Sequence, residues 1–593
     1  MCAFTARPPV MGRRGVVTSG HYLATAAGFR IMEQGGNAVD AAAAMGFCLN
    51  LLEPHQSGLG GEVPVLVYAA NEKRVYALSG VGWTPTSFSI DWCRQHEIEL
   101  IPGDGYLPAT VPAPVGTWGL ALARFGTMSF GQVLQPAIEL AEHGFPVYEG
   151  LHEFIAANRE RFTDLYPTTG AIYCPAGRVP EVGERLRNPD FAATLRLLCS
   201  AEARAGGSRV RGIEAACDAF YRGPIAAQIA RFIADNPVLD ASGREHAGLL
   251  SFEDLAEWQA TAEEPLAVDY RGLLVHKCPA WTQGPVFLQQ LTILEGLDLR
   301  RLGHNSAEYL HHWIEAAKLA FADREAYYGD PRFDKAPWDV LLSKEYGDRR
   351  RAQIGPEASQ ELRPGETGWG RPDLATFDVL QANRTGLRVH AQSPADGHTG
   401  DTTQLDAADW QGNMVAATPS GGWIQASPVI AGLGFCLGTR GQMFYLDARR
   451  ANALAPRKRP RATLTPTIVT RDGRPYLAFG TPGGDGQDQW TLQFFLNYVD
   501  FGMGLQEALE APTVHTDHFP SSFYPRQYRP GGVIAEGRIA PEVIAELERR
   551  GHQVIVTDGW ANGKPMAVHL DLERGVMTGG CSPRGQIGYA LAW

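Results

Sequence analysis

Sequence patterns that mark metal sites, disulfide scaffolds and nucleotide-binding loops are missing from this chain of 593 residues. Its nine cysteines are odd in number and never spaced as CxxC, which argues against a disulfide framework and a structural zinc site. Neither HExxH nor GxxxxGK(S/T) occurs, so a zinc-protease helix and a Walker-type phosphate loop are not expected. We therefore predict a protein that binds no metal and uses no cofactor.

Long runs of basic or apolar residues are also absent. The formal net charge is −12 and no extended basic stretch occurs, so nucleic acid is not expected as a partner. No segment approaches the roughly 18 consecutive apolar residues of a membrane span, and the first fifteen residues lack a long apolar core. We expect no membrane association, no secretory signal and a cytoplasmic location.

The chain is long enough to bury a large core, since 44% of its residues are hydrophobic and 20% are charged. Length alone is compatible with several folding units or with one large enzyme core carrying insertions. Helical patterns dominate the first two-thirds, near residues 20–50, 115–145 and 300–330. Residues 355–400 are rich in Gly, Pro, Glu, Arg and Ser with weak periodicity, which predicts a long exposed linker where a chain is readily cut.

The last third is richer in strands. Three hairpins are expected, at residues 403–408 with 413–418, 464–470 with 475–480, and 567–572 with 576–579. Helical patterns lie between them near 486–511 and 540–551. Strands and helices in this proportion predict a layered sandwich of sheets and helices.

Residues that could carry chemistry are weak signals when taken singly. The pair Thr402-Thr403 stands at the end of the predicted linker and at the start of a strand, where β-propensity alone explains it. The loop at 58–61 (GLGG) precedes a strand, whereas a dinucleotide fingerprint opens a helix. The loop at 481–485 (TPGGD) follows a strand and precedes a helix, so its backbone amides could face an oxyanion or form a plain turn.

Several short segments are informative when they are considered together and in their order along the chain. In the first two-thirds they are 35–41 (GGNAVDA), 58–61 (GLGG), 111–112 (VP), 136–144, 302–306 (LGHNS) and 320–324 (AFADR). In the last third they are 401–403 (DTT), 409–413, 458–460 (KRP), 465–467 (TPT) and 482–484 (PGG). This ordered set resembles the gamma-glutamyltranspeptidase family over nearly the whole chain.

The resemblance implies a precursor that cuts itself at the Asp401–Thr402 bond. It implies a large subunit of residues 1–401 and a small subunit of residues 402–593 that begins with the nucleophile. The implied fold is α+β, the four-layer αββα sandwich of N-terminal-nucleophile hydrolases. The two subunits are expected to associate around one core, with a dimer of the αβ unit as one candidate assembly.

The chemistry implied by the resemblance is consistent with that cut. A hydroxyl is a weak nucleophile, and cleavage would free the α-amino group of Thr402, with a reference pKa near 8, to act as its base. Thr402 Oγ1 would form an acyl-enzyme while the amides of Gly483 and Gly484 hold the oxyanion. Thr403 and Ser420 correspond to hydroxyl positions that orient the nucleophile. A small amide is the implied substrate.

The glutamyl-binding positions depart from the family pattern. No arginine occurs in 79–85 (SGVGWTP), where the family carries one for the substrate carboxylate. An asparagine position falls on Gly422, an amine-binding aspartate falls on Tyr445, and a serine pair falls on Ala462 and Thr463, while a glutamine is kept as Gln442. Losing a bidentate arginine and a charged amine partner changes specificity strongly. Further candidate pocket residues are Trp83, Trp423, Arg440 and Arg461.

The leading hypothesis is a self-processing N-terminal-threonine hydrolase or acyltransferase acting on a non-classical amide. The segments at 60–64 and 417–423 are similar to the branches of the family with altered pockets. The alternatives are an ordinary glutathione hydrolase and gamma-glutamyl transferase, a C–C bond hydrolase of an antibiotic pathway, and a non-catalytic binding protein with the same fold.

Overall fold

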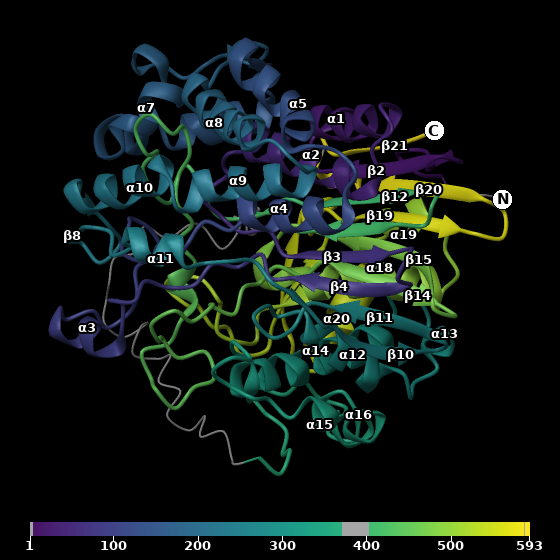
Figure 1. The fold of residues 1–593 in the computed structure, drawn as a ribbon. Coiled ribbons are helices and arrows are strands. Elements are labelled where there is room, and N and C mark those ends of the chain that lie inside the picture. Colours follow the sequence, from purple (N-terminus) through teal and green to yellow (C-terminus); the bar gives the residue numbers. More distant parts are fainter. Residues whose placement is uncertain (1–3, 370–401, 586) are drawn as a thin grey trace.

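Two antiparallel sheets of seven strands each form the centre of the computed structural model, which describes residues 4–369, 402–585 and 587–593 (Figure 1). The first sheet has the order β1 (Val10–Gly12), β20 (Val576–Cys581), β19 (Met566–Asp571), β15 (Arg474–Gly480), β14 (Thr467–Arg471), β11 (Leu273–Lys277) and β10 (Leu266–Tyr270). The second sheet has the order β21 (Tyr589–Ala592), β2 (Gly15–Ser19), β12 (Leu405–Asp409), β13 (Met414–Ala417), β3 (Val65–Ala69), β4 (Arg74–Leu78) and β9 (Ala262–Glu263).

Helices cover the outer face of each sheet, so that the layers run helix, sheet, sheet, helix. On the second sheet these are α1 (Tyr22–Glu33) and α2 (Ala38–Leu52), followed outward by α4 (Pro114–Phe125), α5 (Phe130–His143), α8 (Pro189–Ala205), α9 (Arg209–Tyr221) and α10 (Pro224–Asp235). On the first sheet they are α12 (Pro285–Leu294), α14 (Ala307–Tyr327), α16 (Lys344–Arg351), α18 (Gln487–Val499) and α19 (Leu505–Glu510). Figure 1 places α1 and α2 on one side of the sheets and α12 and α14 on the other. The expected αββα sandwich is confirmed.

Strand alternation explains the layering, because successive side chains of a strand point to opposite faces. In β3, Val65 and Val67 join the cluster under α1 and α2, whereas Leu66 and Tyr68 lie in the cluster between the two sheets. The first sheet repeats the pattern: its strands send Ile468, Ala478 and Val568 between the sheets and Val469, Leu477, Phe479 and Ala567 toward the helices. Both faces of both sheets are therefore buried.

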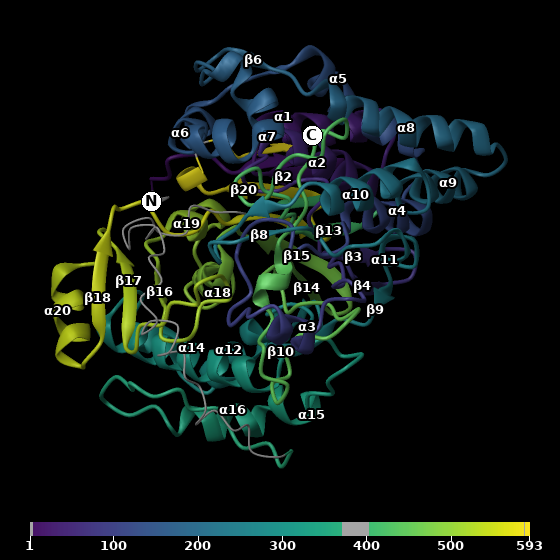
Figure 2. The ribbon, with the colours of Figure 1, turned by 90° about the vertical axis from the view of Figure 1, so that its left-hand side faces the viewer.

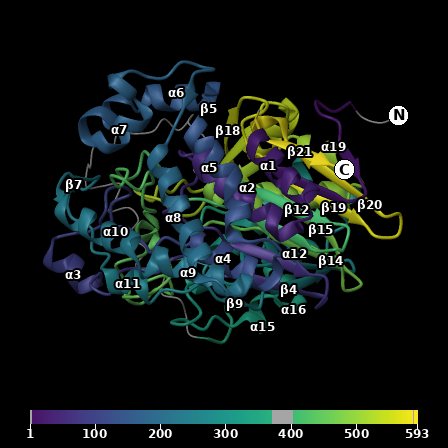
Figure 3. The same cartoon turned by 45° about the horizontal axis from the view of Figure 1, so that its top comes forward.

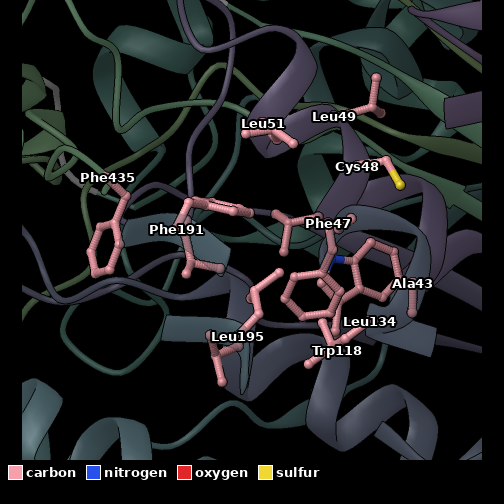
Figure 4. Close-up of a cluster of buried hydrophobic side chains, with 14 of the residues drawn as sticks. Ala43, Phe47, Cys48, Leu49, Leu51, Trp118, Leu134, Phe191, Leu195 and Phe435 are labelled. Atoms are coloured by element: carbon pink, nitrogen blue, oxygen red, sulfur yellow. The ribbon is translucent and has the colours of Figure 1, made fainter. Parts of the chain in front are cut away.

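The alanine-rich helix α2 is the centre of the larger helical layer (Figure 3). Asn37 caps its N-terminus, since its side chain accepts hydrogen bonds from the amides of Val39 and Asp40. All fifteen of its residues are buried, and Phe47 packs beside Trp118 of α4 (Figure 4). Small side chains let the neighbouring helices approach closely, so α2 packs in the interior along its whole length. Its last residues therefore lie in the middle of the sandwich.

The three expected hairpins of the last third are confirmed as β12–β13, β14–β15 and β19–β20. A third sheet that the sequence reading missed consists of β16 (Val514–Thr516), β17 (Gly532–Glu536) and β18 (Gln553–Thr557), with α20 (Pro541–Arg549) joining its parallel pair. Figure 2 shows this sheet at one side of the sandwich.

Shorter elements complete the described chain. The remaining helices are α3 (Ile90–Gln95), α6 (Glu149–Ala157), α7 (Pro167–Tyr173), α11 (Phe252–Ala256), α13 (Leu299–Leu302) and α15 (Trp338–Leu341). The remaining strands form two small antiparallel pairs, β5 (Phe145–Pro146) with β6 (Arg185–Leu186) and β7 (Val238–Leu239) with β8 (Glu245–His246). Residues 355–369 of the expected linker contain no helix or strand, and residues 370–401 lie outside the described residues. None of the described helices has the length and apolar composition that a membrane span requires.

Candidate active site

Thr402 lies three residues before the start of β12, in the middle of the sandwich. The β12–β13 register pairs Leu405 with Ala417, and its continuation pairs Thr402 with Ser420 as an isolated antiparallel bridge. Directly opposed residues present their side chains on the same face, and the two hydroxyl oxygens lie 3.0 Å apart. Both side chains are completely buried. The hairpin therefore builds a hydroxyl pair from residues eighteen positions apart.

Arg440 continues this chain of contacts. Its Nη2 donates a hydrogen bond to Ser420 Oγ, and its Nε donates to Glu62 Oε2 at 3.1 Å. Because a guanidinium can only donate, Ser420 Oγ accepts from Arg440 and can direct its own proton toward Thr402 Oγ1. The guanidinium carbon also lies 4.8 Å from the ring centre of Trp423. Two residues expected to bind substrate, Arg440 and Trp423, thus support the hydroxyl pair.

The glycine-rich loop at 58–61 holds Glu62 in place through the backbone. The amide of Glu62 donates to Ser420 O at 2.8 Å, and the amide of Ser420 donates to Glu62 O at 2.9 Å. A Cβ added to Gly61 would lie 2.1 Å from the Ser420 carbonyl oxygen, so only glycine permits this approach. The loop is therefore a support for Ser420 and Arg440.

Thr403 faces the opposite way and contacts a carboxyl group that the sequence reading missed. Its Oγ1 donates to Glu53 Oε2 at 2.7 Å. Glu53 is the C-cap of α2, directly after Leu52. Burial raises the pKa of the Glu53 carboxyl to about 7, against the opposing effects of the Thr403 hydrogen bond and of Lys564. The sequence feature that could have pointed to Glu53 is an acidic residue directly after an apolar helix.

A pocket of about 100 Å³ opens beside these residues. Its lining includes Thr402, Thr403, Glu53, His55 and Lys564. Burial, with smaller contributions from Lys564 and His21, lowers the pKa of His55 to about 3, so this imidazole is neutral at physiological pH.

The loop at 481–485 reaches the same pocket through Pro482. Gly483 and Gly484 have φ angles of 120° and 52°, in the region that favours glycine. A Cβ on Gly483 would lie 2.2 Å from the ring of Trp490, and one on Gly484 would lie 3.0 Å from the ring of Phe523. Within the part of the chain that the structure describes, neither amide donates a hydrogen bond. The loop thus presents two buried amides that are free to bind an oxyanion.

A buried ionic network fixes the far side of this loop. Asp485 accepts hydrogen bonds from Arg324 and from the Ser522 amide, the latter at 2.8 Å. Arg324 and Arg461 both contact Glu325, and Tyr445 donates to Glu325 at 2.5 Å. Burial alone would raise the pKa of Glu325, but Arg461 and Arg324, together with the Tyr445 hydrogen bond and Arg450, outweigh it and lower the pKa to about 2.

The side-chain amide of Gln442 makes structural hydrogen bonds, and Gly422 is closely packed against neighbouring backbone. Gln442 Nε2 donates to Gly103 O at 3.0 Å, and its Oε1 accepts from the Tyr524 amide at 3.0 Å. Gly422 has a φ angle of 66°, and a Cβ there would lie 3.0 Å from Gly61 N and 3.1 Å from Cys436 O. Gly422 therefore packs against the loop at 58–61, whereas Gln442 links Gly103 to Tyr524.

Two other expected pocket residues lie elsewhere. Trp83 donates to Asp254 O at 3.1 Å and lines a separate hollow with Arg332 and Arg459, which has no residue in common with the Thr402 pocket. Thr463 is completely buried, and its Oγ1 has no hydrogen-bond partner in the described chain. Asp401 lies outside the described residues. The substrate-binding role of Trp83 and Thr463 stays a prediction.

No group of three or more His, Cys, Asp or Glu side chains in the described ranges could hold a metal ion.

The family model for Gamma-glutamyltranspeptidase matches residues 24–592. The chain belongs to the gamma-glutamyltranspeptidase family. Among relatives, it is 31% identical to the glutathione hydrolase-like YwrD proenzyme of Bacillus subtilis, over 97% of this chain and 98% of that protein. It is 33% identical to the acylase ACY 1 proenzyme of Pseudomonas sp. strain SE83, over 94% of this chain and 90% of that protein.

Solved structures of the gamma-glutamyltranspeptidase family agree with the fold. The structure of LmbA2991T421A matches with a TM-score of 0.93 and 44% identity, over 99% of this chain and 100% of that one. The cephalosporin acylase from Bacillus halodurans matches with a TM-score of 0.83 and 31% identity, over 100% of this chain and 98% of that one. The protein is therefore an enzyme of this family, a hydrolase or acyltransferase of the N-terminal-nucleophile type.

Proposed function

We propose that the protein cuts its own chain before Thr402 and then uses Thr402 as the nucleophile of an amide hydrolase or acyltransferase. The hydrogen-bonded series Glu62–Arg440–Ser420–Thr402 is the observation that supports this role most directly. It directs a hydroxyl proton toward Thr402 Oγ1, which stabilises that oxygen as it loses its own proton. The proenzyme names of the relatives support the self-processing step.

In the precursor, Thr402 Oγ1 attacks the carbonyl carbon of Asp401, and the Asp401–Thr402 peptide bond breaks as an ester forms. Water then hydrolyses the ester and leaves Thr402 with a free α-amino group. In the mature enzyme this amine takes the proton of Oγ1 as the oxygen attacks the substrate carbonyl. The amides of Gly483 and Gly484 hold the oxyanion, the amine returns the proton to the leaving group, and water or an acceptor amine releases the acyl group.

The two products of the cut, residues 1–401 and 402–593, stay together in this proposal. Each central sheet contains strands from both segments: β10 and β11 pair beside β14, and β2 and β3 flank the β12–β13 hairpin. Separating the segments would expose these strand edges and the core between the sheets, so association does not depend on the peptide bond.

We further propose a substrate other than a gamma-glutamyl amide. The segment 79–85 has no arginine for a substrate carboxylate. The close packing of Gly422 against Gly61 and Cys436 leaves little room for the asparagine of the family pattern. Tyr445, at the position of the amine-binding aspartate, directs its hydroxyl to Glu325. The acylase names of two similar proteins support an amide of another acyl group.

Denaturing electrophoresis and intact-mass measurement test the self-processing step. The wild-type protein should separate into two fragments whose masses place the cut between Asp401 and Thr402. The Thr402→Ala variant should stay as one chain under the same incubation. A wild-type chain that remains whole after prolonged incubation would overturn the proposal.

Glutathione hydrolysis is the second candidate function, favoured by the similarity to the glutathione hydrolase-like YwrD proenzyme. A chromogenic gamma-glutamyl anilide separates it from the main proposal when assayed beside anilides of simple acyl groups. Turnover of the gamma-glutamyl compound as the best substrate would establish the second candidate and refute the argument from Gly422 and Tyr445.

A further inference from the structure

A second hollow, of about 220 Å³, lies at the outer edge of the second sheet, where β9 pairs with β4 (Figure 2). Ala262 of β9 is opposite Leu78 of β4, and this row of paired residues continues through β3 and β13 to Leu405 of β12. Neighbouring strands are about 4.8 Å apart, so the four steps of this row separate β9 from β12 by about 19 Å. A small ligand in this hollow therefore does not reach Thr402.

The lining of the hollow combines two indole rings with polar side chains. Trp258 is buried, with its ring centre 5.2 Å from that of Tyr221. Trp83 is half-buried, and the guanidinium carbon of Arg332 lies 5.6 Å from its ring centre. The other lining residues are Ser79, Glu257, Gln259, Thr261, Glu263 and Arg459. Two indoles in a small hollow suit an apolar or aromatic group.

The charged side chains at the hollow balance each other. Two carboxylates and two guanidinium groups line it, those of Glu257, Glu263, Arg332 and Arg459. Their further partners add one charge of each sign, because Asp330 contacts both arginines and Arg457 contacts Glu257. A ligand with a charge of one sign would meet a like charge beside its partner, whereas a zwitterion matches both signs.

Both arginines keep donors for a ligand. Arg332 donates to Asp330 and to the Arg457 carbonyl through Nε and Nη2, so that in the described chain its Nη1 donates no hydrogen bond. Arg459 is only 5% exposed, and its Nε has no hydrogen-bond partner among the same residues. The exposed Glu257 carboxylate contacts Arg457 at 2.6 Å and is open to solvent on its other side. A ligand carboxylate would supply the acceptor that the arginine donors lack.

Hydrogen bonds connect the hollow to the loop that carries Gly484. Trp281 Nε1 donates to Glu263 Oε2 at 2.9 Å, and the Ala462 amide donates to Trp281 O at 3.0 Å. The Gln283 amide donates to Ala462 O at 2.8 Å, and the Gln283 side chain reaches the loop, with its Nε2 3.5 Å from Gly484 O. A change at Glu263 is thus linked to the loop through a continuous series of contacts.

We propose that this hollow is an effector site for a free α-amino acid with an apolar or aromatic side chain. Arg332, supported by Arg459, holds the carboxylate, and Glu257 holds the ammonium group. The side chain of the ligand lies against the two indoles. Pockets for drug-sized ligands begin at about 300 Å³, so a hollow of about 220 Å³ suits a ligand of amino-acid size. The inference does not rest on the proposed self-cleavage, since the two pockets share no lining residue.

Calorimetric titration with three matched compounds tests the site without requiring turnover. Wild-type protein should bind phenylalanine at least about tenfold more tightly than hydrocinnamate, which lacks the ammonium group, or phenethylamine, which lacks the carboxylate, because each analogue loses a hydrogen bond to a charged group. Glu257→Gln should remove the preference over hydrocinnamate, and Arg332→Met should remove the preference over phenethylamine. Glu253→Gln changes an exposed glutamate of α11 outside the lining; it is the matched control and should bind like the wild type.

Hydrogen exchange followed by mass spectrometry tests the connection to the loop. Bound phenylalanine should slow exchange in peptides that cover residues 459–463 and 481–485, and should leave β18 unchanged. Trp281→Phe keeps an aromatic ring but lacks the donor to Glu263. This variant should bind phenylalanine and lose the effect at 481–485.

Wild-type protein that binds phenylalanine no more tightly than either analogue, or a Glu257→Gln variant that keeps the full preference, would overturn the amino-acid site. Binding that leaves exchange at 481–485 unchanged would overturn its role as an effector site. Self-cleavage fails by a separate observation, a chain that stays uncut.

Discussion

Thr402 and Ser420 face each other across the start of the β12–β13 hairpin, with their hydroxyl oxygens 3.0 Å apart. Removing the Ser420 hydroxyl leaves the buried Thr402 oxygen without this donor. Because that oxygen gains negative charge during attack, we expect Ser420→Ala to slow self-cleavage and turnover by roughly ten- to a hundredfold. The rate of fragment appearance and kcat measure the effect. Ser420→Thr keeps the hydroxyl and should stay close to wild type; an equal loss in both variants would contradict the assigned contact.

Arg440 and Glu62 form a completely buried ion pair, with Nε 3.1 Å from Oε2. Replacing Arg440 removes a buried counter-charge of Glu62. We expect Arg440→Met to lower the free energy of unfolding by about 3–5 kcal/mol in chemical denaturation. The double variant Glu62→Gln/Arg440→Met should recover a large part of that loss. If the two single losses simply add in the double variant, the pair is not coupled as described.

Glu53 makes stability depend on pH. Its pKa is raised from 4.5 in the unfolded chain to about 7 in the folded protein, so the folded state binds the extra proton between these values. The folded protein therefore loses stability as pH rises from about 4.5 to about 7, by about 3 kcal/mol for this group. Glu53→Gln stays neutral and should flatten this part of the stability curve. Parallel curves for the two proteins in this window would contradict the burial of an ionisable carboxyl.

The loop at 481–485 requires glycine for space as well as for backbone angle. We expect Gly483→Ala to lower kcat by at least about a hundredfold, because the methyl group would meet the Trp490 ring and displace the amides that we propose hold the oxyanion. Gly473→Ala in the β14–β15 turn is the matched control, since Gly473 has a φ angle of 70° but no atom within 4 Å of an added Cβ. If the two variants have similar activities, the loop at 481–485 does not require glycine for space at position 483.

The central fold could be read from the sequence because its signals are local. Alternating side chains bounded by turn residues predicted the three hairpins, and all three are present. The third sheet was missed because its parallel strands β17 and β18 are joined through α20, and their pairing leaves no tight-turn signature. The layering of helices on both sheets came from the family resemblance.

The candidate site was predicted only as far as the family pattern reaches. Thr402 lines the pocket, Ser420 is hydrogen-bonded to it through the hairpin register, and the loop of Gly483 and Gly484 reaches the pocket through Pro482. Glu53 and Lys564 could not be predicted from the sequence. Glu53 directly follows α2 and Lys564 shortly precedes β19, 511 positions later in the chain. Only the packing of the sandwich places both side chains in the lining of the pocket. Residues that are brought together over such a distance in the chain leave no pattern in a short stretch of sequence.

Each central sheet contains strands from both sides of residue 402. If the two segments were translated from separate messages, β12, β13 and β14 would each emerge without one of their two neighbours, and such unpaired edges template aggregation. A continuous chain keeps the missing neighbours at the high local concentration that a tether provides. The uncut polypeptide therefore acts as its own assembly factor, independent of the chemistry that follows.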